Sequence, residues 1–376
     1  MSKSIVFFCG GEGISELSKN IKNSDYNISY IVPISDNGGS SSEIIKHFGG
    51  PAIGDIRKRL TDISGDESLE GQAVHRLLTF RTDRVNTVLS ENQWNDIVRG
   101  RSLLWENISP GYRYWILSDL IYFDSEIKLR ARNFDFRNMN IGNCFFSGAR
   151  MRMNSLEAAI FNFSRVAMIK NTDVIPVIDT NKTLEIGCIL QNEKRIIGQK
   201  FISYDKGNLD KKQQKSLPSK IKKIFYLNDD HQEYKPQVNP HVVSVLKKAD
   251  IIIYAMGSFW TSLMPSLILG GVGDVIASKQ IPKLFILNGY PDRETYDMQA
   301  VDFVYSVFNA LSEKSTGINS KYITHLLHLE GTPFIIDGDV IKKMEIEIVS
   351  LNSKVGVKTY DSKTLANYIY TIVSQM

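Results

Sequence analysis

Residues 35–42 read SDNGGSSS and follow directly on the apolar run ISYIVPI at residues 28–34. A near-continuous apolar run is typical of a strand in a parallel sheet that is covered on both faces. A plain turn after such a strand needs only one or two glycine or polar residues. Here Asp36 is followed by an asparagine, two glycines and three serines, so the stretch is longer than a turn requires.

The residues before this stretch predict a strand, a glycine-rich turn and a helix. Residues 4–9 (SIVFFC) are mostly apolar, residues 10–13 (GGEG) interrupt them, and residues 14–21 carry isoleucine and leucine at helical spacing. Together with the run at residues 28–34 they form the pattern of a βαβ unit.

The rest of the chain extends this α/β pattern. We expect one Rossmann-like domain over residues 1–376, doubly wound around a mostly parallel sheet, with a helical insertion at residues 66–134 and a small β-excursion at residues 172–204. Further strands are predicted at residues 223–227, 249–257 and 283–289, and helices at 54–64, 155–169 and 293–311. His325 and His328 have the spacing of one helical turn, which favours a partly buried helix.

Composition excludes several classes of protein. A net charge of +4, from 45 basic and 41 acidic residues, is not the basic surface expected of a nucleic-acid binder. No apolar run reaches the length of a membrane span. The three scattered cysteines indicate neither a disulfide framework nor a zinc site, so we expect a cytoplasmic protein without nucleic-acid or membrane partners.

Polar, glycine-rich loops follow several of the predicted strands. In an open parallel sheet such loops meet at the carboxyl ends of the strands, where ligands bind. Their glycines allow backbone N–H groups to approach a phosphate, and Arg57 could pair with one. The candidate binding residues are Gly10, Gly11, Gly13, Gly38, Gly39, Ser40, Ser41, Arg57, Gly257, Ser258, Thr261, Ser262 and Asn288.

Each loop also has a purely structural explanation. Glycine in the turn at residues 10–13 could serve helix–strand packing alone. Asp36 could form an Asx-turn ahead of a serine N-cap, and Asp55 could be a favourable charge in the first turn of a helix. Asp36 also suits a metal-bound diphosphate or a base for a hydroxyl nucleophile. Five such loops in one chain favour a common diphosphate or nucleotide site.

The ordered set of loops resembles the family that unites 2-phospho-L-lactate transferase with the gluconeogenesis-factor proteins that bind nucleotide sugars. The resemblance runs from Ile5 to about Phe308. It is carried by the glycine loop at residues 9–13, DNGGSS at 36–41, PAIGDIR at 51–57, IGN at 141–143, GSFWTS at 257–262, and Asn288 followed by Glu294, Thr295 and Asp302.

The resemblance implies a Rossmann-like fold and a site for a nucleotide-linked small molecule. It assigns the metal or acceptor carboxylate to Asp36, the diphosphate to the loops at residues 10–13 and 257–262, and the nucleotide to the surroundings of Asn143 and Asn288. We expect Mg²⁺, with Asp36 and Asp55 as catalytic and metal-binding carboxylates, and no organic cofactor is established.

Two functions remain open at this point. The first is a magnesium-dependent transferase that moves a phosphorylated group from a nucleoside diphosphate donor to an alcohol. The second is a regulator that binds a nucleotide sugar or dinucleotide without turnover. The Trp- and Tyr-rich insertion is expected to form either a lid or the interface of a homodimer.

Overall fold

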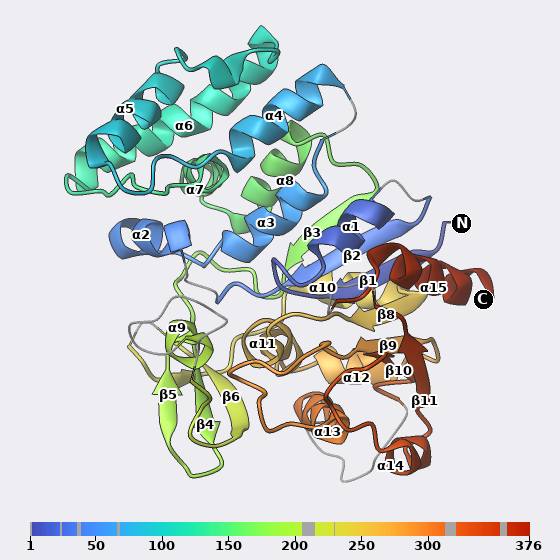
Figure 1. Cartoon of the computed structure of the whole chain (residues 1–376). Coiled ribbons are helices and arrows are strands. Elements are labelled where there is room, and N and C mark those ends of the chain that lie inside the picture. The colour runs from blue at the N-terminus through green and yellow to red at the C-terminus, as the bar shows by residue number, and fades with distance from the viewer. Residues whose placement is uncertain are drawn as a thin grey trace. The chain divides into compact units, whose positions relative to one another are not determined.

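The computed structural model describes residues 2–22, 25–35, 39–65, 68–204, 215–228, 230–312, 321–353 and 359–376. The chain divides into two compact units (Figure 1). Unit 1 comprises Met1–Asp36, Asn171–Ile178 and Glu185–Met376, and unit 2 comprises Asn37–Lys170 and Asp179–Leu184. Within the described ranges, every helix is too short or too polar to cross a membrane.

Unit 1 is built on a parallel sheet of seven strands in the order β11-β10-β9-β8-β1-β2-β3. Its central strands are buried on both faces, which is why they read as continuous apolar runs. The strands are β1 (Ser4–Phe8), β2 (Asn27–Val32), β3 (Thr172–Pro176), β8 (Ile251–Tyr254), β9 (Lys283–Ile286), β10 (His325–Leu329) and β11 (Glu347–Leu351).

The order of the strands reverses between β1 and β8. Right-handed crossovers therefore place helices on opposite faces of the sheet (Figure 1). On one face α1 (Ser15–Ile21) packs against α15 (Ser362–Ser374). On the other, α12 (Val272–Ala277) contacts both α10 (Pro240–Lys248) and α13 (Ala300–Leu311). This doubly wound arrangement confirms the predicted fold class.

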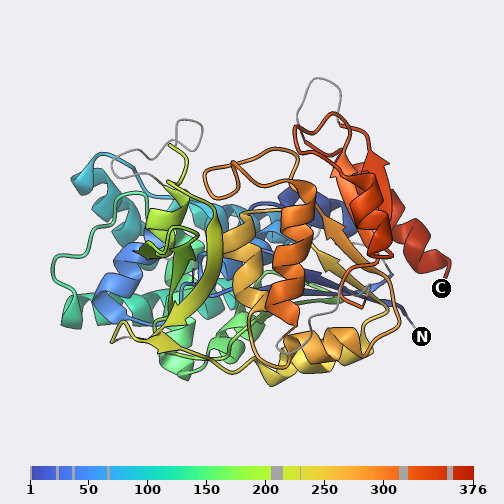
Figure 2. The same ribbon diagram turned by 90° about the horizontal axis from the view of Figure 1, so that it is seen from below.

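A smaller antiparallel sheet with the order β5-β4-β6-β7 completes the strands described in unit 1. It consists of β4 (Glu185–Leu190), β5 (Arg195–Ile197), β6 (Ile221–Leu227) and β7 (Glu233–Tyr234), with α9 (Gln199–Ser203) after β5. Figure 2 shows the long, curved β6 beside α11 (Met264–Leu267), and the hydroxyl of Tyr226 donates to the carbonyl of Pro265 at 3.0 Å.

The predicted β-excursion at residues 172–204 differs from the structure at both ends. Residues 172–176 form β3, which pairs with β2 and is an edge strand of the main sheet. Residues 199–203, predicted to continue a strand, form α9. Gly198, with φ of 94°, ends the extended segment because this left-handed conformation does not fit a strand.

One helical prediction in unit 1 is wrong at its start, and another is wrong entirely. The helix expected over residues 293–311 begins only at Ala300, because Asp292 ties residues 292–295 into a turn by accepting from the backbone N–H groups of Glu294 and Thr295, both at 3.0 Å. His325 and His328 lie on strand β10, whose leucines are buried between β9 and β11. A spacing of three residues between histidines therefore does not indicate a helix in this segment, which is a strand covered on both faces.

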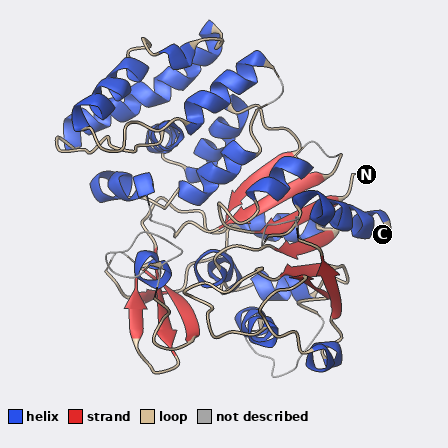
Figure 3. Cartoon of the chain, viewed as in Figure 1, coloured by secondary structure: helices blue, strands red, loops and turns tan. Residues whose placement is uncertain are grey.

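Unit 2 is helical, and strands are absent from its described part (Figure 3). Helices occupy most of the predicted insertion, and α6 packs against both α5 and α7. The helices are α2 (Gly39–Phe48), α3 (Gly54–Asp62), α4 (Leu69–Thr79), α5 (Thr87–Val98), η1 (Leu103–Trp105), α6 (Pro110–Arg130), α7 (Ile141–Met153) and α8 (Leu156–Val166).

Candidate functional site

The loops that follow β1 and β8 meet at the point where the strand order of unit 1 reverses. The N–H of Ala255 donates to the carbonyl of Phe8 at 2.9 Å and continues the pairing to the ends of both strands. A Cβ built on Gly13 would lie 2.1 Å from the carbonyl oxygen of Met256. Gly257 has φ of 152°, a conformation that side chains with a Cβ rarely adopt. The two loops therefore touch backbone to backbone, and both glycines are required by this contact.

Exposure to solvent differs among the residues of the loop after β1. Gly10 and Gly11 are buried, whereas Glu12 is exposed. The acid therefore faces solvent and not the packed interior of the loop.

Asn288, two residues after the end of β9, holds the loop after β8 in place. Its Oδ1 accepts from the N–H of Gly257 at 3.1 Å, and its Nδ2 donates to the carbonyl of the same residue at 2.7 Å. Both ends of the amide are thus bonded to one glycine. We predicted that Asn288 lies near the nucleotide, and the structure gives it the role of positioning Gly257.

The side chains of the 257–262 loop divide into buried and accessible ones. Ser258 and Ser262 are partly exposed, and Ser262 N–H donates to the carbonyl of Ser258 at 2.8 Å in the π-helix η3 (Phe259–Leu263). Thr261 is fully buried, and its hydroxyl donates to Oε1 of Glu294 at 2.8 Å. Ser258 and Ser262 are the side chains of this loop that a ligand can reach.

Glu294 is a residue of the candidate site to which the sequence analysis gave no role, although it belongs to the family motif after Asn288. The residue is 4% exposed, and its carboxylate accepts hydrogen bonds from Ser203 Oγ at 2.6 Å, Thr261 Oγ1 at 2.8 Å and Trp260 N at 3.2 Å. Burial, and then the charge of Asp292, raise the pKa of Glu294 to about 7. The motif of an acid and a threonine after Asn288 was the signal that could have found it.

A second group of predicted residues comes together in unit 2. Asn143 is 2% exposed, accepts from Arg57 Nε at 2.9 Å and donates to Ser40 Oγ at 2.8 Å and to Ser41 Oγ at 3.4 Å. A Cβ on Gly54 would lie 3.1 Å from Ser41 Oγ. These contacts join the first turns of α2, α3 and α7.

This arrangement is suited to an anion. The N-terminal turn of each helix carries partial positive charge from unsatisfied N–H groups, and Arg57 adds a guanidinium beside them. Asn140 caps α7 by accepting from the N–H of Asn143 at 3.0 Å, which fixes the orientation of the Asn143 backbone. Among the residues predicted to bind, Ser40, Ser41, Arg57 and Asn143 therefore form one hydrogen-bonded cluster.

The predicted magnesium ligands are only partly described. Asp55 is buried in the first turn of α3, next to Gly54. Asp36 and Gly38 lie outside the described residues, and of Gly39 only the backbone of α2 is described. In the described ranges, no three His, Cys, Asp or Glu side chains gather to hold a metal ion. Mg²⁺ needs only one or two protein carboxylates beside waters and phosphates, so Asp55 fits as one ligand.

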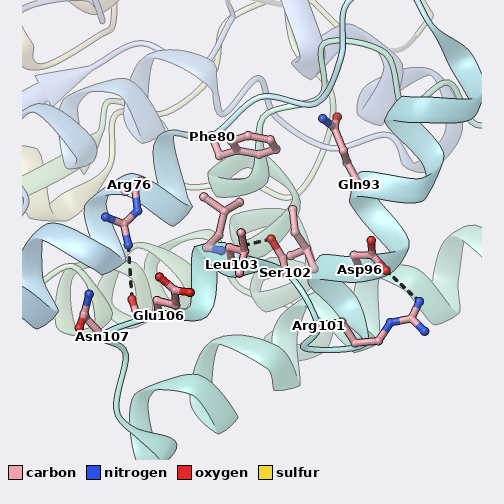
Figure 4. Close-up of a pocket in the computed structure, with 11 residues that line it drawn as sticks. Arg76, Phe80, Gln93, Asp96, Arg101, Ser102, Leu103, Glu106 and Asn107 are labelled. Atoms are coloured by element: carbon pink, nitrogen blue, oxygen red, sulfur yellow. Dashed lines mark hydrogen bonds and ion pairs between the residues drawn. The ribbon is translucent and has the colours of Figure 1, made fainter.

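Unit 2 also contains a pocket that the sequence did not predict. It has a volume of about 560 Å³ and lies among α4, α5 and η1 (Figure 4). Its two arginines already have partners, since Arg76 donates to the carbonyl of Glu106 and Arg101 pairs with Asp96. Leu103, which lines it, is 76% exposed. The pocket is thus an open depression between exposed side chains.

The fold and the strand-end loops define a Rossmann-like α/β protein with its candidate site at the topological switch point. The model of the family "2-phospho-L-lactate transferase CofD" matches residues 5–364. The chain is 30% identical to an uncharacterized protein of Saccharomyces cerevisiae, over 97% of this chain and 99% of that one. It is 23% identical to a putative gluconeogenesis factor of Thermotoga maritima, over 98% of each.

Solved structures share the fold. The crystal structure of a Bacillus halodurans protein has a TM-score of 0.71 at 19% identity and covers 98% of this chain and 100% of that one. Because the family model matches residues 5–364, the chain belongs to the 2-phospho-L-lactate transferase (CofD) family. This confirms the resemblance drawn from the strand-end motifs.

Proposed function

We propose that this protein is a nucleoside-diphosphate-dependent transferase that moves a phosphorylated group from a nucleotide-linked donor to an alcohol. The observation that carries the proposal is the meeting of the loops after β1 and β8 at the switch point, where Gly13 and Gly257 bring backbone close to backbone. In open α/β sheets this is the position at which a diphosphate binds. Family membership supports the same class of ligand.

In the proposed reaction, the acceptor hydroxyl attacks the phosphorus of the group to be transferred. A new phosphorus–oxygen bond forms, the bond to the bridging oxygen of the diphosphate breaks, and a nucleoside monophosphate leaves. Asp36 is the proposed base that takes the hydroxyl proton. Ser258 and Ser262 would contact the diphosphate, and Arg57 would pair with negative charge on the donor.

Mg²⁺ is the proposed metal, with Asp36 and Asp55 as its protein ligands. It would supply positive charge at the phosphate oxygens. Asp55 contributes a buried carboxylate at the start of α3, in the unit that also holds the Arg57–Asn143 cluster.

A second candidate is a regulator that binds a nucleotide sugar or dinucleotide without turnover. It is favoured by the names of the relatives, several of which are gluconeogenesis factors of bacteria such as Thermotoga maritima and Halalkalibacterium halodurans. The same loops would serve this function, because binding needs no catalytic carboxylate.

Thermal unfolding with a panel of nucleoside diphosphates and nucleoside diphosphate sugars, each with and without Mg²⁺, tests the shared ligand class. We expect at least one ligand to stabilise the protein, by about 2.7 kcal/mol at a concentration one hundred times its Kd. Stabilisation by none of them would contradict both candidates. Mass spectrometry of the purified protein identifies any nucleotide that it retains.

Asp36→Asn separates the two candidates. A transferase should keep its ligand-induced stabilisation in this variant and lose release of nucleoside monophosphate in the presence of an alcohol acceptor. If the wild type binds nucleotides but releases no monophosphate with any donor and acceptor, and Asp36→Asn binds as the wild type does, the regulator is the correct candidate.

A further inference from the structure

Glu294 links three segments of unit 1 through one carboxylate. It lies in the loop between β9 and α13, and its partners are Ser203 at the end of α9 and Trp260 and Thr261 in the π-helix η3. The same loop supplies Asn288, which holds Gly257. The binding loop at residues 257–262 is therefore shaped at its first residue by Asn288 and at its centre by Glu294.

The hydrogen-bond partners described for the Glu294 carboxylate are all uncharged donors. In the described part of the chain no basic side chain forms an ion pair with it, and its donors are two hydroxyls and one backbone N–H. The neighbouring Arg293 points elsewhere, with its Nε donating to the carbonyl of Ile202 at 3.1 Å and its Nη1 to that of Lys215. A buried carboxylate without a cation is costly to keep ionised.

Of two other titratable groups near Glu294, one is acidic and one is a neutral thiol. Asp292, in the same loop, is acidic and raises the pKa of Glu294 in addition to the effect of burial. On β4, the pKa of the Cys188 thiol is raised to about 12, first by burial and then by the charge of Glu294. From the π-helix and α9, the described groups that hydrogen-bond to Glu294 are the donors already named. Proton binding at Glu294 would therefore relieve an unfavourable negative charge.

We propose that Glu294 is a positioning residue of the 257–262 loop and that binding of an anionic diphosphate at this loop is coupled to the uptake of one proton by Glu294. The inference rests on the proposed function, because it requires an anion at the loop. A ligand that brings negative charge to the loop repels the carboxylate beneath it, and protonation removes this repulsion.

The hydrogen bonds of the cluster can accommodate both protonation states. A proton from solvent adds to Oε1, which becomes a hydroxyl and donates to Ser203 or Thr261, and that residue's hydroxyl turns from donor to acceptor. Trp260 N–H keeps donating to Oε2 at its distance of 3.2 Å. The loop is thus held in place in both states, and only the local charge changes.

Glu294→Gln tests this coupling because the amide is neutral at every pH and offers a donor and an acceptor, as the protonated acid does. The probe is UDP-glucose, a nucleoside diphosphate sugar whose doubly esterified diphosphate keeps a constant charge near neutral pH. We expect the Kd of the wild type to rise on the order of tenfold from pH 6 to pH 8. The Kd of the Gln variant should stay constant and match that of the acidic wild type.

Glu233→Gln is the matched control, since Glu233 lies in unit 1 with its side chain 46% exposed, beside Arg195. It should show the pH dependence of the wild type. Equal slopes for wild type and Glu294→Gln would overturn the proposal. If Glu294→Gln fails to fold, titration calorimetry of the wild type at pH 7 in buffers of different ionisation enthalpy measures the number of protons taken up on binding. An absence of proton uptake would overturn the proposal.

A measurement without ligand separates this inference from the proposed function. The pKa of Glu294 is raised in the folded state, so its contribution to stability is complete below about pH 4.5 and is lost as the pH rises through about 7. Glu294→Gln should therefore gain stability relative to the wild type from pH 5 to pH 8. If Glu294→Gln gains stability in this way but neither protein binds a nucleotide, Glu294 does titrate and the proposed function is contradicted. If both proteins instead bind UDP-glucose with equal, pH-independent affinity, the proposed ligand class stands and the coupling to proton uptake is contradicted.

Discussion

Gly13→Ala is expected to lower the free energy of unfolding by roughly 3 kcal/mol, at the upper end for an overpacked site. The added Cβ would lie 2.1 Å from the carbonyl oxygen of Met256 and 2.7 Å from Cα of Gly257. Both contacts are with backbone, so no side chain can rotate away to relieve them. The loops after β1 and β8 would be forced apart, and ligand binding at the switch point should be lost together with stability.

Urea unfolding of the variant measures this effect, and Gly338→Ala in the same unit is its control. A Cβ on Gly338 would meet only the end of the Ile348 side chain at 3.8 Å, an ordinary contact. We expect Gly338→Ala to change stability by less than about 0.5 kcal/mol. If the two variants were equally stable, the close contact between the two loops would be disproved.

Asn143→Asp is expected to weaken binding of a nucleoside diphosphate on the order of a hundredfold while leaving the protein folded. The carboxylate can still accept from Arg57 Nε and from the hydroxyls of Ser40 and Ser41, so the bonds of the cluster survive. It adds negative charge where the first turns of α2, α3 and α7 meet. An anion bound there would be repelled.

Two further variants serve as controls for this measurement. Asn143→Ala removes one acceptor of the buried Arg57 guanidinium and should cost roughly 2 kcal/mol of stability. Comparing it with Asn143→Asp separates the loss of structure from the effect of added charge. Asn92→Asp makes the same charge change at an exposed position of α5 and should leave affinity unchanged. Calorimetric titration of all three with UDP-glucose decides, and unchanged affinity in Asn143→Asp would remove this cluster from the proposed site.

The main sheet could be predicted from the sequence where its strands are continuous apolar runs. This held for β1, β2, β8 and β9, each followed by a glycine-rich loop. It failed for β10, because a run as short as HLLHL fits a strand and a helix equally well. Only its pairing with β9 and β11 decides between them.

The candidate site could be predicted only in part, for a different reason. Glycines at strand ends mark close approach of backbone, and their positions are visible in the sequence. The function of Asn288 in holding Gly257, and the burial of Glu294 among two hydroxyls and an N–H, depend on segments far apart in the chain. Ser203 lies 91 residues from Glu294, and no local sequence pattern predicts such a contact.

The packing of α1 against α15 has a consequence for the order in which unit 1 can assemble. Asn20 Nδ2 of α1 donates to Ser362 Oγ at 2.8 Å, and the rings of Tyr26 and Tyr370 lie 5.4 Å apart. The first βα unit emerges from the ribosome early, but the helix that covers it is synthesised more than three hundred residues later. Contacts of such long sequence separation form slowly. The packing of α15 against α1 can therefore form only after residues 362–374 have been synthesised, so it is a late step in the assembly of unit 1.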